Sequence, residues 1–217
     1  MPVDYSFFEA SLADQRTYRG QWDRQQLGLF EGAQARGRLE LLSRKRDDLR
    51  FRGTHVMRPG HPLGLAQVNE QLGITLPEDI DAFYRRWNGG LLVLKRFYHL
   101  LSAADIIRRS REMRQIRREP GPPELPWHLV RFCDLGNSEY LALRFDPSTS
   151  DWNVFWASHE ELDAYYIADT AKPPGRREFT IVDPSFRSWL QRMCATDGWP
   201  ECPDDNPTPP FFERVAV

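Results

Sequence analysis

The stretch LGITLPEDIDAFYRRWNGG, Leu72 to Gly90, places glycine and proline on both sides of one short amphipathic segment. Thr75 and Glu78 have the spacing of a capping box, and Pro77 suits the first turn of a helix. Apolar residues then recur at i, i+3, i+4 and i+7, namely Ile80, Phe83, Tyr84 and Trp87. The Asn-Gly-Gly at 88–90 tolerates the left-handed conformation that ends a helix. The stretch therefore predicts a capped helix with one buried face, not a reaction site.

The composition is that of a globular chain with a substantial core. The 217 residues are 41% hydrophobic and 12% aromatic, which suits one generous domain. The net charge of -2 gives no overall attraction to nucleic acid or to an anionic membrane. The first residues lack the features of a signal peptide, and no window reaches the roughly 20 apolar residues of a membrane helix. We therefore expect a cytoplasmic protein without membrane association.

The cysteines favour a reducing compartment. Cys133, Cys194 and Cys202 are odd in number and contain no C-x-x-C pair, so neither a disulfide framework nor a zinc site is indicated. A small loop closed by Cys194 and Cys202 in an oxidising compartment is the less favoured alternative.

The composition and the positions of proline and glycine divide the chain into three parts. Residues 1–62 have the pattern of amphipathic helices with arginine-rich faces, and the prolines and glycines of residues 55–64 predict a turn after them. Residues 63–195 form the predicted main domain, and residues 196–217 form a proline-rich tail that is expected to be loop-like.

The main domain is predicted to be α+β. Its strands are a hairpin (LLVL and FYHLL), a meander (LVRFC, EYLALRF and WNVFW) and the extended segment FTIV. Ser102 and Asp105 form a capping box before a basic helix, and Asp183 is expected to cap the last helix. The stripe of that helix is Phe186, Trp189, Leu190 and Met193. Strands and helices do not alternate, so we expect an antiparallel or mixed sheet of about five to six strands packed against several helices.

This order of motifs resembles the SUKH superfamily, specifically its Smi/Knr-type branch. The resemblance rests on four segments. Residues 73–90 contain a Gly-Ile-x-Leu-Pro start, an aromatic helix and an Asn-Gly-Gly end. The other three are the strand of residues 97–101, the turn and strand of residues 136–146, and the Ser-Phe-x-x-Trp-Leu helix of residues 185–190. It covers about Leu65 to Met193, over half of the chain.

The resemblance implies a protein-binding module. Bacterial SUKH proteins are widely regarded as immunity proteins, each of which neutralises one cognate toxin of a polymorphic or type VI secretion system. We therefore expect this chain to bind such a toxin, a nuclease or another enzyme with a basic cleft, and to occlude its active site. We expect no small-molecule substrate and no cofactor. Two alternatives remain: a regulatory protein-binding scaffold, as in the fungal relatives, and a nucleic-acid binder that uses the helix Arg108–Arg118.

Charge is segregated along the chain. From Lys95 to Glu119 there are eight basic and three acidic residues. From Cys133 to Ala171 there are eight acidic residues and one basic residue, Arg144. An acidic face suits a basic target because opposite potentials raise association rates and discriminate among partners. A merely solvated surface is an equally weighted interpretation. The predicted partner contacts are Asp146, Asp151, Trp152, Glu160, Glu161 and Asp163.

No catalytic or metal site is predicted. His159 precedes Glu160 and Glu161, but the spacing is not H-E-x-x-H and no second histidine is near. Cys133 ends an apolar strand, where cysteine is more often a small core residue than a nucleophile. Because no nucleophile, base and orienting group can be assembled from the spacing, we expect no enzyme activity.

Overall fold

The computed structural model describes residues 2–13, 16–20, 39–45, 48–53, 56–94, 97–116, 129–136, 139–146, 151–157, 178–196, 198 and 213–216. The helices are α1 (Ser6–Ala13), α3 (Ala66–Leu72), α4 (Glu78–Arg86), α5 (Ala103–Ile116) and α7 (Phe186–Ala195). The strands are β1 (Arg16–Gly20), β2 (Leu39–Lys45), β3 (Asp48–Gly53), β4 (Val56–Pro59), β5 (Trp87–Val93), β6 (Phe97–Leu100), β7 (Leu129–Gly136), β8 (Glu139–Asp146), β9 (Asp151–Ala157), β10 (Glu178–Asp183) and β11 (Glu213–Ala216).

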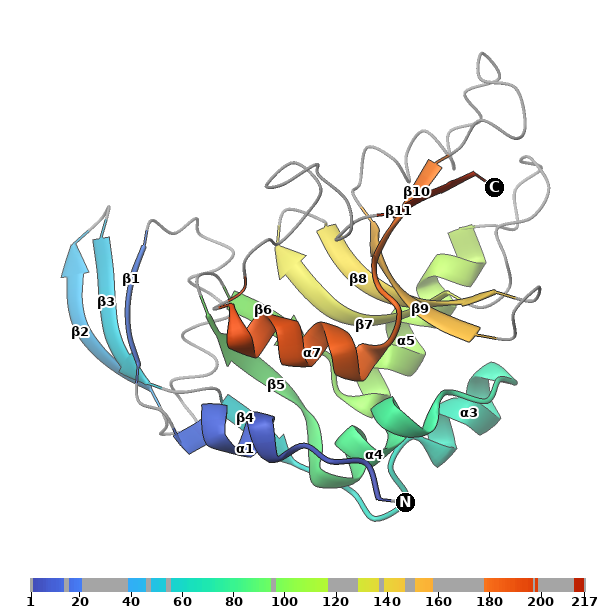
Figure 1. Ribbon diagram of the computed structural model, residues 1–217, viewed down its shortest axis with the longest axis horizontal. Helices are drawn as coiled ribbons and strands as arrows, with labels where there is room; N and C mark the ends of the chain where they lie inside the picture. Colours follow the sequence, from blue (N-terminus) through green and yellow to red (C-terminus); the bar gives the residue numbers. More distant parts are fainter. Residues whose placement is uncertain are drawn as a thin grey trace.

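The main sheet has eight strands in the order β11-β10-β9-β8-β7-β6-β5-β4, and each neighbouring pair is antiparallel. α7 and α1 lie in front of this sheet in Figure 1. The predicted α+β class, hairpin and meander are confirmed. The sheet is wider than expected because β4 and β11, which come from outside residues 63–195, add a strand at each edge.

The helical prediction for residues 1–62 was wrong over most of its described part. β1, β3 and β2 form a separate three-stranded sheet, visible at the left of Figure 1. The sequence of β3, in which Leu49 and Phe51 alternate with charged residues, has the period of two that favours a strand. The loop-like prediction for the tail was wrong at residues 213–216, which pair with β10.

The Asn-Gly-Gly of residues 88–90 does not end α4, contrary to the prediction. α4 ends at Arg86, and the chain turns directly into β5. Gly89 has a φ of +68°, and a Cβ at this position would collide with the carbonyl oxygens of Leu100 and Leu101. Asn88 Oδ1 accepts the N–H of Ala103 at 2.8 Å and so caps α5. The three residues join a strand closely to the start of the next helix.

The caps differ in part from the predicted ones. Pro77 occupies the N-cap of α4 without a side-chain hydrogen bond there, so the Thr75 and Glu78 capping box was wrong. The Ser102 and Asp105 pair is present, because the Asp105 N–H donates to Ser102 Oγ at 3.2 Å.

The last helix is capped by a serine rather than by the predicted aspartate. Ser185 is the N-cap of α7 and forms a capping box with Ser188. Asp183, predicted as that cap, instead pairs with Arg192 at 2.7 Å. Burial raises the pKa of the Asp183 carboxyl, and the Arg192 guanidinium opposes this shift. The aspartate therefore ties β10 to α7 from the side of the helix.

The core contains a cluster of aromatic rings from α1, α4, α7 and β7. Phe83 packs against Phe186 with ring centroids 5.1 Å apart, and Phe132 packs against Trp189 at 5.2 Å. The predicted stripes of α4 and α7 are buried here, except that Trp87 is half-buried and begins β5. Phe8 of α1 is fully buried against Phe83 at 5.4 Å. The N-terminal helix is therefore part of the core, where one buried Phe contributes about 1.5–3 kcal/mol.

Candidate partner-binding surface

Two surface pockets meet at Trp152. The first has a volume of about 560 Å³ and is lined by Asn69, Glu70, Gly73, Ile74, Thr75, Phe145 and Trp152. The second has a volume of about 550 Å³ and is lined by Pro77, Asp79, Asp151, Trp152, Pro184, Ser185, Arg187 and Ser188. We call these residues together the Trp152 surface. It joins α3 and the α3–α4 loop, the end of β8, the start of β9 and the start of α7.

Trp152 reaches the surface because the meander extends beyond the core. In the β8–β9 register Phe145 stands opposite Trp152, and the two ring centroids are 5.3 Å apart. Leu141 and Leu143 share the face of Phe145 in β8 and are buried in the core. The row of apolar side chains thus continues from the core to a half-buried aromatic pair at its edge.

The facing wall of the first pocket comes from the loop between α3 and α4. Gly73, with a φ of +65°, ends α3 in the left-handed conformation. Asn69 Oδ1 accepts the N–H of Leu76 at 3.1 Å and so closes the loop onto α3. This closure holds Ile74, which is half-buried, in the pocket wall opposite the aromatic pair.

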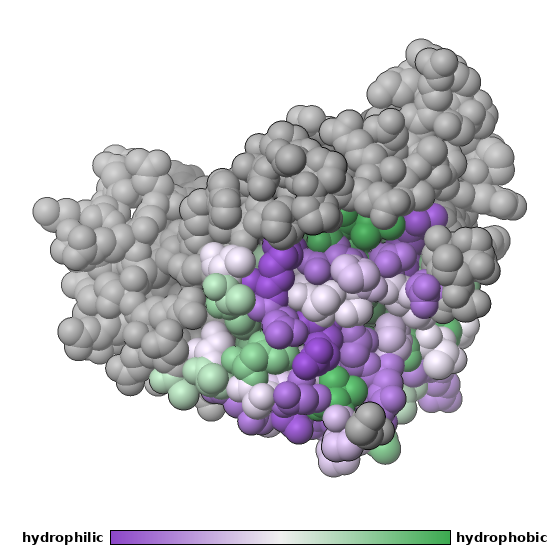
Figure 2. All heavy atoms as spheres, in the orientation of Figure 1, coloured by the Kyte–Doolittle hydropathy of each residue, from purple (hydrophilic) through white to green (hydrophobic). Residues whose placement is uncertain are grey.

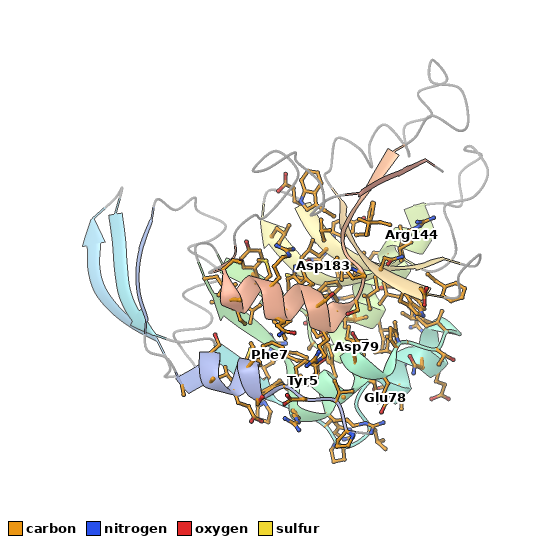
Figure 3. The ribbon with its side chains drawn as sticks, viewed as in Figure 1. Tyr5, Phe7, Glu78, Asp79, Arg144 and Asp183 are labelled. Carbon is orange, nitrogen blue, oxygen red and sulfur yellow. The ribbon has the colours of Figure 1, made fainter. Side chains whose placement is uncertain are left out.

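The wall of the second pocket is built around Asp79. Its Oδ2 accepts the N–H of Arg187 at 2.9 Å, which joins α4 to the first turn of α7. The Tyr5 hydroxyl donates to the Asp79 carbonyl oxygen at 2.5 Å. Burial first, and the Asp79 charge second, raise the pKa of Tyr5 well above its ordinary value, so this hydroxyl keeps its proton. Figure 3 shows Tyr5, Phe7 and Asp79 side by side at this junction.

The charge at the pockets is mainly negative. Glu70, Asp79 and Asp151 are lining residues, and Arg187 is the basic lining residue of the described chain. Arg187 Nε donates to the Asp4 carbonyl oxygen at 3.0 Å, and its guanidinium lies 5.7 Å from the centroid of the Phe7 ring. Its charge is thus directed toward the N-terminal segment.

The structure brings together part of the predicted site. Asp151 is exposed and Trp152 is half-buried on this surface, and Asp146 is the register partner of Asp151 in β8. Glu160, Glu161 and Asp163 lie outside the described residues. Sequence reasoning missed Glu70, Ile74, Asp79, Phe145 and Arg187. Of these, only Phe145 carried a usable signal, because it alternates with the apolar core positions of its strand.

Two arginines of α5, Arg108 and Arg109, pair with acids of the same helix. Arg108 lies 3.1 Å from both Asp105 and Glu112, and Arg109 lies 3.1 Å from Glu112. Arg58 of β4 adds a contact to Asp105 at 3.7 Å. Arg117 and Arg118 are outside the described residues. At these two arginines the positive charge is partly neutralised within the helix.

The described residues show neither an accessible Cys133 thiol nor a metal-binding cluster. Cys133 is fully buried in the core, as its sequence context predicts. Among the described residues, no group of three His, Cys, Asp or Glu side chains could hold a metal ion. In this part of the chain, none of the helices has the length and hydrophobicity needed to cross a membrane. Hydrophobic and hydrophilic residues are interspersed over the described part of the face shown in Figure 2.

The sequence comparison agrees with the fold. Residues 64–192 match the SMI1 / KNR4 family (SUKH-1), and this range contains α3, α4, α5, the strands β5 to β10 and most of α7. No curated protein matches the chain. The matched range is more than half of the 217 residues. The chain therefore belongs to the SMI1 / KNR4 family (SUKH-1).

Proposed function

We propose that this protein is a cytoplasmic immunity protein that binds one cognate toxin and neutralises it by occluding the toxin's active site. Family membership supports a binding module of this kind. The observation that carries the proposal is Trp152, a half-buried aromatic residue that forms a wall of two adjacent pockets. Tryptophan in such a setting is typical of the few residues that dominate the affinity of an interface.

The surroundings of Trp152 suit a preformed interface. Asp79 is held by hydrogen bonds from Ile80 at 2.8 Å and from Arg187 at 2.9 Å, and Asn69 holds the loop opposite. Side chains already held in place lose little conformational freedom when a partner binds. The acidic residues favour a basic target, such as the cleft of an enzyme that acts on nucleic acid, because complementary potentials speed association.

The test is coexpression with the toxin encoded beside this gene. We expect the protein to restore growth and to bind the purified toxin with a measurable Kd. Trp152→Ala should raise that Kd at least about 30-fold, since the loss of an interface hot spot costs about 2 kcal/mol or more. Calorimetry of the full-length proteins measures the change.

The matched control is Glu78→Gln, which removes an exposed acid of α4 that lies outside both pocket linings. We expect wild-type affinity for this variant. A harmless neighbouring gene product that does not bind would refute the immunity function. Several unrelated partners of equal affinity would favour the regulatory scaffold instead.

A further inference from the structure

The two pockets differ in character although they share Trp152. The first presents Ile74, Phe145 and the indole of Trp152 as apolar walls, with the exposed Glu70 at its side. The second combines Asp79 and Asp151 with serines, prolines and Arg187, whose guanidinium is directed away toward Asp4 and Phe7. An apolar side chain gains free energy by entering the first pocket, whereas a cation gains more from the second.

A common wall sets the spacing of the side chains that fill the pockets. Because one indole separates them, the two side chains must come from positions close together in the partner. In an extended segment, residues i and i+2 point to the same side and lie roughly 7 Å apart. This spacing lets one strand-like segment place a side chain on each side of the indole.

The second pocket fits a guanidinium in particular. Both oxygens of Asp79 accept one backbone N–H, and a carboxylate has about four acceptor positions, so each oxygen can accept another bond. The exposed Asp151 adds a second negative charge. A planar guanidinium can bond to a carboxylate and stack on an indole at the same time, which an ammonium group does less well.

We propose that the Trp152 surface binds an extended peptide segment with a bulky aliphatic residue in the first pocket and an arginine two positions away in the second. This inference rests on the proposed function, because it names the part of the toxin that the protein grips. Nucleic acid is the wrong ligand for this surface, since Glu70, Asp79 and Asp151 repel phosphate.

The probe is a set of blocked pentapeptides added to the full-length protein. The test peptide is acetyl-Gly-Leu-Ser-Arg-Gly-amide, and the comparisons replace its arginine with glutamate or its leucine with glycine. NMR follows the indole N–H of Trp152, identified by its loss in Trp152→Phe. We expect the test peptide to shift this signal and to bind at least about 10-fold more tightly than either comparison, the equivalent of about 1.4 kcal/mol.

Two variants test whether the charge of the pocket lining, and not a general change in the protein, sets the affinity for the peptide. Asp151→Asn should weaken the test peptide at least about 3-fold, and Glu78→Gln should leave it unchanged, because only the first removes a charge from the pocket lining. Rising salt should weaken binding to the wild type.

Equal binding of the arginine and glutamate peptides would overturn the inference, as would shifts confined to residues away from Trp152. Toxin neutralisation without arginine-dependent peptide binding would refute this inference and leave the immunity function standing. Arginine-dependent binding at Trp152 by a protein that neutralises no toxin would support the pocket chemistry and refute the proposed function.

Discussion

Trp87 and Trp152 are both half-buried tryptophans, the first residue of β5 and the second of β9, yet their surroundings differ. Trp87 has the rings of Phe8 and Phe83 at 4.9 Å and 5.1 Å, and that of Tyr5 at 6.1 Å. Trp152 meets the ring of Phe145 and then opens onto two pockets. Residue type and partial exposure therefore do not distinguish a ring packed among other rings from one that lines pockets. What separates them is that Trp87 lies among three rings, whereas Trp152 packs against Phe145 and lines two pockets.

The largest expected effect tests this comparison directly. Trp87→Ala should lower the free energy of unfolding by about 3–5 kcal/mol, because it leaves a cavity among packed rings. Trp152→Ala should cost less than half as much, since its ring packs against that of Phe145 and lines two pockets instead of filling a cluster of rings. Urea unfolding of both variants measures the difference as a shift in midpoint at constant slope. Equal losses would show that Trp152 is a core residue like Trp87 and would contradict the difference between them.

A smaller loss of stability is expected at Gly89, where the backbone of β5 lies close to that of Leu100 and Leu101. Gly89→Ala should lower the free energy of unfolding by at least about 2 kcal/mol, because the left-handed φ is strained and the new Cβ meets the carbonyl oxygens of Leu100 and Leu101. Gly73→Ala is the control, since its φ is similar but its Cβ would meet no atom within 4 Å. That variant should lose only the conformational contribution, about 1–2 kcal/mol. A loss as large as that of Gly89→Ala would contradict the close approach.

The smallest effect concerns acid stability at the start of α5. Burial acts against ionisation of Asp105, but hydrogen bonds from Ser102 and Arg108 outweigh it and lower the pKa of this carboxyl below its ordinary 3.8. A lowered pKa contributes stability above pH 3.8 that is lost as the pH falls through the folded-state value.

The variant Asp105→Asn should therefore be slightly less stable than the wild type at pH 7, by less than about 1 kcal/mol because the site is partly exposed. The difference should shrink as the pH falls below 3.8. Urea unfolding at a series of pH values measures it, and a difference that is constant with pH would contradict the assignment.

Local sequence patterns predicted which helices and strands form better than they predicted where each one ends. The period of 3.6 identified Ile80, Phe83 and Tyr84 as the buried face of α4, and alternation identified the meander. The Asn-Gly-Gly of residues 88–90 was misread because the same residues suit a helix end and a tight strand crossing. Only the nearby carbonyls of Leu100 and Leu101 distinguish the two.

The candidate site was predictable only where it lies on one strand. Asp151 and Trp152 are conspicuous as an acidic and an aromatic residue in a turn-rich region. Asp79 and Arg187 are not, because the hydrogen bond that joins them spans 108 residues. Charge counting gave the excess of basic residues around α5 but could not show that Arg108 pairs with Asp105 and Glu112.

By itself, the sequence determined the α+β class, the family and the order of elements from α3 to α7, because periodicity and turn chemistry act over a few residues. The tertiary structure alone decided that α1 packs into the core, that β4 and β11 widen the sheet, and that two pockets meet at Trp152. These features depend on contacts between distant segments, such as the hydrogen bond between Tyr5 and Asp79, which are 74 positions apart in the sequence. No local preference encodes such a contact, because its free energy arises only when the whole chain brings the two surfaces together.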